Sequence, residues 1–184
     1  MTDSVGRVGG ARVWQHRFLD AHLDQVRFPD GSVGEQVLIH HPGAAAVVPF
    51  LSDPAGEDPQ LLLIHQYRYA VEGLLWEIPA GRLEPGEPTL TCAHRELLEE
   101  TGCTASSMTS LTSIWTAPGF TNERIEIFLA TGLTRGESKR EADEFIEVVT
   151  LPMSQVLRMI ESGEITDAKT VVGVLFAAGF RGRR

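Results

Sequence analysis

The stretch that decides the fold runs from Gly81 to Cys103 and reads GRLEPGEPTLTCAHRELLEETGC. We predict a helix over Pro88–Thr101, because proline suits the first helical position and Gly102 follows the last turn as a stop. Residues at helical spacing form a mostly apolar stripe along it: Leu90, Ala93, Leu97 and Thr101. The pattern predicts a loop followed by an amphipathic helix that packs on a core.

Three carboxylates share another side of this predicted helix. At about 100° per residue, Glu96, Glu99 and Glu100 fall together, away from the apolar stripe. Like charges at this spacing repel by roughly a few tenths of a kcal/mol per exposed pair. An acidic, solvated helix face is one interpretation. The other is a site for Mg²⁺, which prefers carboxylate oxygens and would neutralise the cluster.

The spacing of the whole stretch favours the metal site. Gly81 is followed after five residues by Glu87, after seven more by Arg95-Glu96-Leu97, after one by Glu99-Glu100, and after one by Gly102 and Cys103. This pattern resembles the signature of the Nudix hydrolase family, with Cys103 where an aliphatic residue is more usual. The resemblance implies a loop–helix–loop that holds Mg²⁺ or Mn²⁺ and cleaves a diphosphate bond.

The resemblance also implies roles for individual residues. Glu96 and Glu100 would be the principal metal ligands, Glu99 a further ligand or a catalytic base, and the carbonyl of Ala80 would join them. Arg95 would act in catalysis by orienting the glutamates through ion pairs.

Two positions of the loop complete this set. Glu87 would support the loop. Gly81 would contact substrate, at a tight turn with close backbone approach.

Residues outside the motif point to a branch of the family. The segment HQYRYAVEGLLWEIPAG (65–81) and Pro118 resemble the ADP-ribose pyrophosphatase branch. Within it, Arg68 would bind phosphate with its planar fork, while Glu77 and Pro118 would contact substrate. The implied reaction is hydrolysis of ADP-ribose to AMP and ribose 5-phosphate.

A late glutamate of that branch resembles Glu144, in the stretch DEFIEVVTLP (143–152). A carboxylate within hydrogen-bond reach of the attacking water can serve as its base. We expect Glu144 in this role, with Glu141 as the alternative because loop lengths vary here.

One departure leaves the substrate open. Related sequences carry Arg-Glu where this chain has Glu35-Gln36, so Arg27 or Arg68 would have to supply the phosphate contact. The alternatives are a nucleotide sugar of the GDP-mannose type, NADH or FAD. A non-catalytic sensor of ADP-ribose is a further alternative, although the motif glutamates are all present.

The remaining sequence predicts an α+β fold. The resemblance implies a Nudix α/β/α sandwich with a mixed central sheet and an N-terminal antiparallel strand extension. We expect a mobile N-terminus over residues 1–10, dimer-forming strands over 11–40, and the hydrolase domain over 41–184. Trp14, Phe18 and Phe28 are candidates for core or dimer packing, or for the stacking on adenine that the resemblance implies.

Composition narrows the class of protein. The chain has 184 residues and a formal net charge of −9, which disfavours a general nucleic-acid-binding surface. We find no signal peptide and no apolar run of membrane-spanning length. The two cysteines have no metal-binding spacing, and the adjacent pair His40-His41 would point to opposite faces of a strand. These features predict a cytoplasmic protein with reduced thiols, and the resemblance to the ADP-ribose pyrophosphatase branch implies a homodimer.

Overall fold

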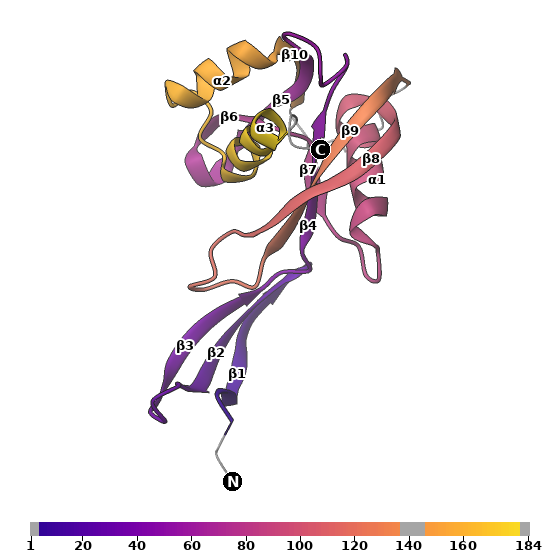
Figure 1. Ribbon diagram of the computed structural model, residues 1–184. Helices are drawn as coiled ribbons and strands as arrows, with labels where there is room; N and C mark the ends of the chain where they lie inside the picture. The colour runs from indigo at the N-terminus through magenta and orange to yellow at the C-terminus, as the bar shows by residue number, and fades with distance from the viewer. Residues whose placement is uncertain (1–3, 137–145, 181–184) are drawn as a thin grey trace. The chain divides into compact units, whose positions relative to one another are not determined.

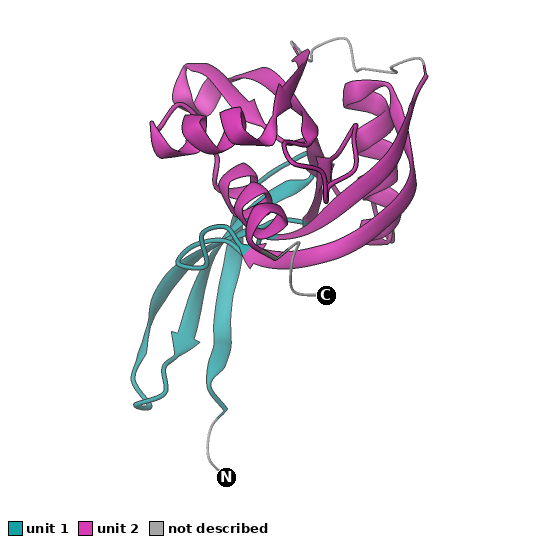
Figure 2. Cartoon of the chain, turned by 45° about the horizontal axis from the view of Figure 1, so that its top comes forward, with its two compact units in different colours: residues 1–43, 115–124 teal, residues 44–114, 125–184 magenta. Residues whose placement is uncertain are grey.

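The computed structural model describes residues 4–136 and 146–180. The chain divides into two units (Figure 2). Unit 1 comprises residues 1–43 and 115–124, and unit 2 comprises residues 44–114 and 125–184. Each unit is described by itself below.

Unit 1 is built on an antiparallel sheet in the order β1-β2-β3 (Figure 1). Its strands are β1 (Gly6–His16), β2 (Leu19–Arg27) and β3 (Val33–His40). The turn between the first two strands places Arg17 in the left-handed region, with a φ of 50°. The sequence predicted these strands but started the first one at residue 11. The structure begins it at Gly6, so part of the glycine-rich stretch that we expected to be mobile is strand.

Unit 2 contains two sheets. One is antiparallel and has the order β10 (Ile146–Pro152), β5 (Gln60–Arg68), β6 (Gly73–Glu77). The other has the order β7 (Ala80–Arg82), β4 (Ala44–Pro49), β9 (Arg124–Arg135), β8 (Cys103–Trp115). It is mixed, because β4 runs parallel to β9 and antiparallel to β7. The sequence did not predict the short strand β7, which proves to carry part of the candidate site.

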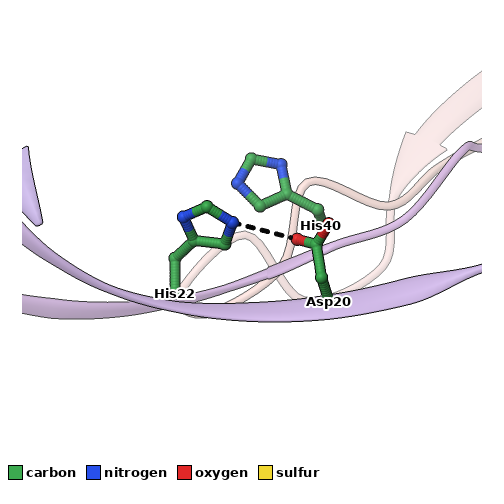
Figure 3. Close-up of side chains that lie close together, drawn as sticks. All are labelled: Asp20, His22 and His40. Carbon is green, nitrogen blue, oxygen red and sulfur yellow. Dashed lines mark ion pairs between the residues drawn. The ribbon is translucent and has the colours of Figure 1, made fainter. Parts of the chain in front are cut away.

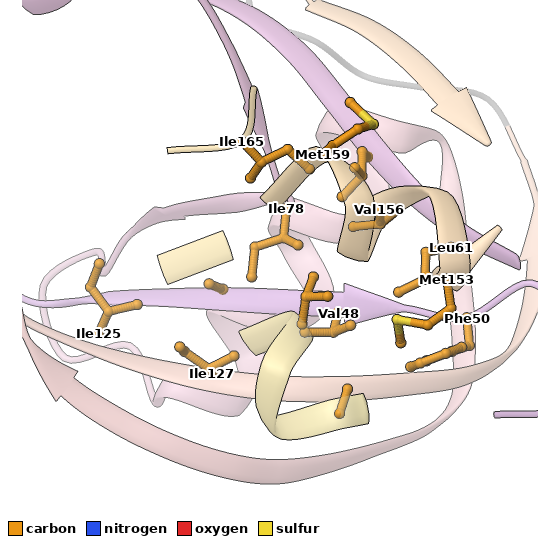
Figure 4. Packing of buried hydrophobic residues seen from close by; sticks show 14 of the residues in the cluster. Val48, Phe50, Leu61, Ile78, Ile125, Ile127, Met153, Val156, Met159 and Ile165 are labelled. Atoms are coloured by element: carbon orange, nitrogen blue, oxygen red, sulfur yellow. The ribbon is translucent and has the colours of Figure 1, made fainter. Parts of the chain in front are cut away.

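Strand β4 lies at the centre of unit 2, and all six of its residues are buried. Side chains alternate between the two faces of a strand, and the side chains on each face of β4 pack in a different hydrophobic cluster. Ala46 and Val48 pack with side chains of α2 (Met153–Glu161) and α3 (Ala168–Phe180), in the cluster of Figure 4. Val47 packs with Ala93 and Leu97 of α1 (Thr89–Thr101). Helices therefore cover both faces, as Figure 1 shows.

Helix α1 lies where the motif predicted a helix, but its first residue and part of its buried stripe differ from the prediction. Pro88 is its extended N-cap rather than its first helical residue, and Gly102 ends it with a left-handed φ of 69°. Ala93 and Leu97 are fully buried as the stripe predicted, but Leu90 is exposed. Cys92 is buried instead, so the buried side of the first turn is the one that carries Cys92 rather than Leu90.

Among the residues that the structure describes, no helix combines the length and the apolar character needed to cross a membrane.

Gly173 marks the close approach of α3 to the sheet. A Cβ added there would lie 2.9 Å from Val48 Cγ2, 3.1 Å from Ile127 Cγ2 and 3.2 Å from Ile78 Cδ1. We expect Gly173→Ala to lower the free energy of unfolding by about 1–3 kcal/mol, because overpacking outweighs the gain in helix propensity. Chemical denaturation measures this.

Gly179→Ala is the matched control in the same helix. Its added Cβ would meet nothing within 4 Å, so this change should be neutral or stabilising by up to about 1 kcal/mol. Equal stability of the two variants would contradict tight packing of α3 on β4.

Candidate active site

The carboxylates of α1 differ in exposure although they share one face of the helix. Glu96 and Glu100 are buried, with 8% and 2% of their surface exposed, whereas the Glu99 side chain is 35% exposed. Buried carboxylates are costly unless hydrogen bonds or positive charges compensate them. The structure supplies such partners from strand β7 and from Arg95.

Strand β7 brings backbone directly against the two buried carboxylates. The N–H of Ala80 donates to Glu100 Oε2 at 2.9 Å. A side chain at Gly81 would overlap the carboxylate of Glu96, which occupies the space where a Cβ would lie. Glycine is therefore required here by the close approach of β7 to Glu96.

Arg95 joins the loop before the helix to the glutamates on it. Its Nε and Nη2 donate to the two oxygens of Glu87 at 3.0 and 2.9 Å. Its Nη1 donates to Glu96 Oε1 at 2.6 Å and to Glu99 Oε2 at 3.1 Å. The paired fork is the geometry that makes Arg–carboxylate bonds strong. One guanidinium thus fixes three carboxylates relative to one another.

These contacts shift the ionisation of both partners. The hydrogen bonds from Arg95 lower the pKa of Glu87 from 4.5 to about 2, against a smaller opposing effect of burial. The hydrogen bonds to Glu87 likewise raise the pKa of Arg95. Both groups are therefore charged at neutral pH.

Cys92 ties the first turn of α1 to the loop. Its thiol donates to the carbonyl oxygens of Gly81 at 3.5 Å and Arg82 at 3.4 Å. Burial, and then the charge of Glu96, raise the pKa of the thiol to about 12. Cys92 is therefore a neutral packing residue, and sequence spacing gave no sign of its contact with Gly81.

A second charged cluster lies where β5, β6 and α3 meet. Arg68 Nε and Nη2 donate to the two oxygens of Glu77 at 2.7 and 2.9 Å. Glu77 is buried and also accepts a hydrogen bond from Lys169. Lys169 lies 3.1 Å from Asp167 Oδ2 as well. Arg68 keeps 40% of its side chain exposed, so part of its fork faces outward.

Hydrogen bonds and neighbouring charges shift the pKa values of Glu77 and Arg68. Burial favours a raised pKa for Glu77, but the hydrogen bond from Arg68 and the charges of Lys169 and Arg68 together lower it. The pKa of Arg68 is raised by its hydrogen bond to Glu77, with smaller contributions from Glu100 and Asp167. The negative charge of Glu100 thus also favours the charged form of Arg68.

The start of α3 fixes this cluster to the backbone that leads into β7. Asp167 Oδ2 accepts from the N–H and hydroxyl of Thr170 at 3.0 and 2.6 Å, as an N-cap does. Thr170 Oγ1 in turn accepts from the N–H of Ile78 at 2.9 Å. The sequence analysis missed Asp167, Lys169 and Thr170. The spacing of Asp167 and Thr170 is a capping signal, but only the fold shows what the cap holds.

The other residues expected at the site lie outside the described residues or in unit 1. Glu141 and Glu144 lie outside the described residues. Pro118, Arg27 and Glu35-Gln36 belong to unit 1. There, Pro118 sits in a turn in which the N–H of Phe120 donates to Ala117 O at 3.1 Å.

Comparison with known proteins shows the family to which the chain belongs. The family model described as NUDIX domain matches residues 41–171. An ADP-ribose pyrophosphatase of Bacillus subtilis (strain 168) is 36% identical over 167 residues, which is 90% of this chain and 88% of that protein. A methanol dehydrogenase activator of Bacillus methanolicus is 34% identical over the same shares.

A solved structure supports the fold. The crystal structure of an ADP compounds hydrolase superposes with a TM-score of 0.83, at 21% identity, over 97% of this chain and 94% of that one. This match confirms the α+β fold that the sequence predicted.

The lowered pKa of Glu87 predicts how the stability that its ion pair with Arg95 contributes depends on pH. Because the pKa in the folded state is about 2 and the ordinary value is 4.5, the ion pair contributes its full stability above pH 4.5 and loses it as the pH falls through 2. We expect Glu87→Gln to destabilise the protein by a constant amount above pH 4.5, and by less and less below it. Denaturant unfolding at a series of pH values measures the difference.

Glu84→Gln is the control for this series, since it removes an exposed carboxylate of the same loop. Its effect should be small at every pH. A Glu87→Gln effect that stays constant down to pH 2 would show that Glu87 does not carry the ionised contact.

Proposed function

The chain belongs to the NUDIX domain family, and from that membership we propose that it hydrolyses the diphosphate bond of ADP-ribose, giving AMP and ribose 5-phosphate. The observation that carries the chemistry is the face of α1, where Glu96 and Glu100 are buried against Ala80 and Gly81. The substrate rests on the likeness to the ADP-ribose pyrophosphatase of Bacillus subtilis.

The donor set of this face fits a divalent metal ion. Glu96, Glu99, Glu100 and the carbonyl of Ala80 all offer oxygen, the ligand that Mg²⁺ and Mn²⁺ prefer. Two of the carboxylates are buried, so a cation would offset the cost of keeping them ionised there. When bound, such an ion polarises the diphosphate and helps to generate hydroxide from water.

We assign positioning roles to the charged neighbours. Arg95 orients Glu96 and Glu99 through the contacts at 2.6 and 3.1 Å. Arg68 binds a phosphate of the substrate with the exposed part of its fork, and buried Glu77 acts through Arg68 by holding that fork in place. The burial of Glu77 is the reason to prefer this role over the substrate contact that we expected from the sequence.

The proton acceptor for the attacking water is assigned from the sequence resemblance. Glu144 takes this role, with Glu141 as the alternative and Glu99 as the carboxylate within α1 that can share it. Gly81 and Pro118 remain proposed substrate contacts. In unit 1, Pro118 lines a cavity of about 340 Å³ together with Arg7, Val37, His40 and Phe120.

A regulatory protein without catalysis is the second candidate, because one relative is named a methanol dehydrogenase activator. The intact set of glutamates and the organised Arg95 contacts favour catalysis, since a binding protein has no need to bury carboxylates for a metal.

We also propose a cytoplasmic homodimer. The two cysteines are free and buried, as expected for a reducing compartment. The N-terminal sheet exposes large apolar side chains, among them Val13, Trp14 and Val37, and clustered apolar surface of this kind is typical of an interface.

A substrate panel with Mg²⁺ tests the proposed reaction. We expect ADP-ribose to have a higher kcat/KM than GDP-mannose, NADH or FAD, with AMP and ribose 5-phosphate as products. Glu100→Gln is the control that assigns the activity to this site, and it should abolish most turnover. Faster hydrolysis of a nucleotide sugar would overturn the substrate. Binding of ADP-ribose with no hydrolysis of any compound would favour the regulatory candidate.

Gly81→Ala tests whether close approach of the backbone positions Glu96. The added methyl group must displace the Glu96 carboxylate, and a displacement of about 1 Å can cost roughly a hundredfold in rate. We expect kcat/KM to fall by about that factor, and Mn²⁺ affinity, measured by electron paramagnetic resonance, to fall as well.

Gly73→Ala serves as the control for this variant. Its Cβ would meet only Val71 O, at an ordinary 3.6 Å, so turnover and Mn²⁺ affinity should be unchanged. A Gly81→Ala protein that also keeps both would show that Glu96 does not depend on Gly81.

A further inference from the structure

We propose that unit 1 carries a second metal site, for a divalent transition ion of the Zn²⁺ class, on Asp20, His22 and His40. One ligand atom from each of these residues lies within 4.8 Å of the other two. Figure 3 shows the three side chains converging above the sheet. This site goes beyond the proposed function, because it uses none of the α1 glutamates.

The register of the sheet explains why these residues meet. Asp20 and His22 are two residues apart on β2, so their side chains leave the same face. His40 of β3 is the register partner of Asp20, which places it on that face too. The rings of His22 and His40 have centroids 4.6 Å apart, and His22 Nε2 lies 3.2 Å from Asp20 Oδ1.

This group includes a buried polar atom that has no hydrogen-bond partner in the described part of the chain. Among these described residues, Asp20 Oδ1 is buried and accepts no hydrogen bond, although His22 Nε2 lies 3.2 Å away as an ion-pair neighbour. Buried polar atoms without partners are rare in native structures, and an ion that has not been placed is one of the explanations for them. The arrangement is thus what a bound cation would leave behind.

The chemistry of the donors selects the ion. Two imidazoles and one carboxylate suit Zn²⁺, Ni²⁺ or Co²⁺, whereas Mg²⁺ requires oxygen ligands. Oδ1 of the neighbouring carboxylate Asp24 accepts a hydrogen bond from Arg7 Nε at 2.7 Å. The same oxygen lies 3.8 Å from His22 Nδ1, so Asp24 can orient the ring while Nε2 faces Asp20. Three protein ligands leave at least one coordination position for water. The bound ion joins β2 to β3 and so stabilises the N-terminal sheet.

Cobalt is the probe that tests this site. Untagged Glu100→Gln protein in excess Mg²⁺ keeps the α1 carboxylates from contributing, and Co²⁺ is then titrated while its visible d–d absorption is recorded. We expect one Co²⁺ per chain in this background, and a rise in melting temperature when Zn²⁺ is added. Adding Asp20→Asn or His40→Gln should weaken Co²⁺ binding by at least about tenfold.

His16→Gln is the matched control, since His16 is an exposed histidine on β1 of the same sheet. It should leave the titration unchanged. Equal Co²⁺ affinity in the Asp20→Asn, His40→Gln and His16→Gln proteins would overturn the site. Because binding is read in a protein that lacks Glu100, this result is independent of whether ADP-ribose is the substrate.

Discussion

The fork of Arg95 is the interaction on which the candidate active site depends. Three carboxylates in a small volume repel one another, and two of them, Glu87 and Glu96, are largely buried. A single guanidinium satisfies Glu87 with two hydrogen bonds and still reaches Glu96 and Glu99. Removing one partner of such a buried pair leaves an uncompensated charge. Arg95 therefore holds the loop and the helix together.

The second cluster repeats this arrangement with the charges exchanged. Buried Glu77 is an anion held between two cations, Arg68 and Lys169. Asp167 and Thr170 then connect the cluster to the backbone at Ile78. Since Ala80 follows two residues later, one continuous network runs from the N-terminus of α3 to the strand that contacts Glu96 and Glu100.

The sequence predicted what local spacing determines and missed what strand pairing determines. Helical periodicity and fixed spacing were enough to find α1, Gly81, Arg95 and the glutamates. No periodicity reveals that Lys169 meets Glu77, ninety-two residues away in the chain. The same limit applies to histidines: His40 beside His41 is a poor chelate, yet sheet register brings His40 to His22 and Asp20. Leu90 was misplaced because a stripe on a helical wheel does not show where the core ends.

The position of β4 affects how readily the backbone of the site opens to solvent. This strand is buried on both faces and hydrogen-bonded along both edges, to β9 and to β7. Ala80 and Gly81 pair with Ala46 and Ala45 of that strand. Amide hydrogens in such a strand exchange with solvent only when the whole unit opens. The backbone that carries the proposed ligands is thus anchored to a buried strand of unit 2 whose amide hydrogens we expect to exchange slowly.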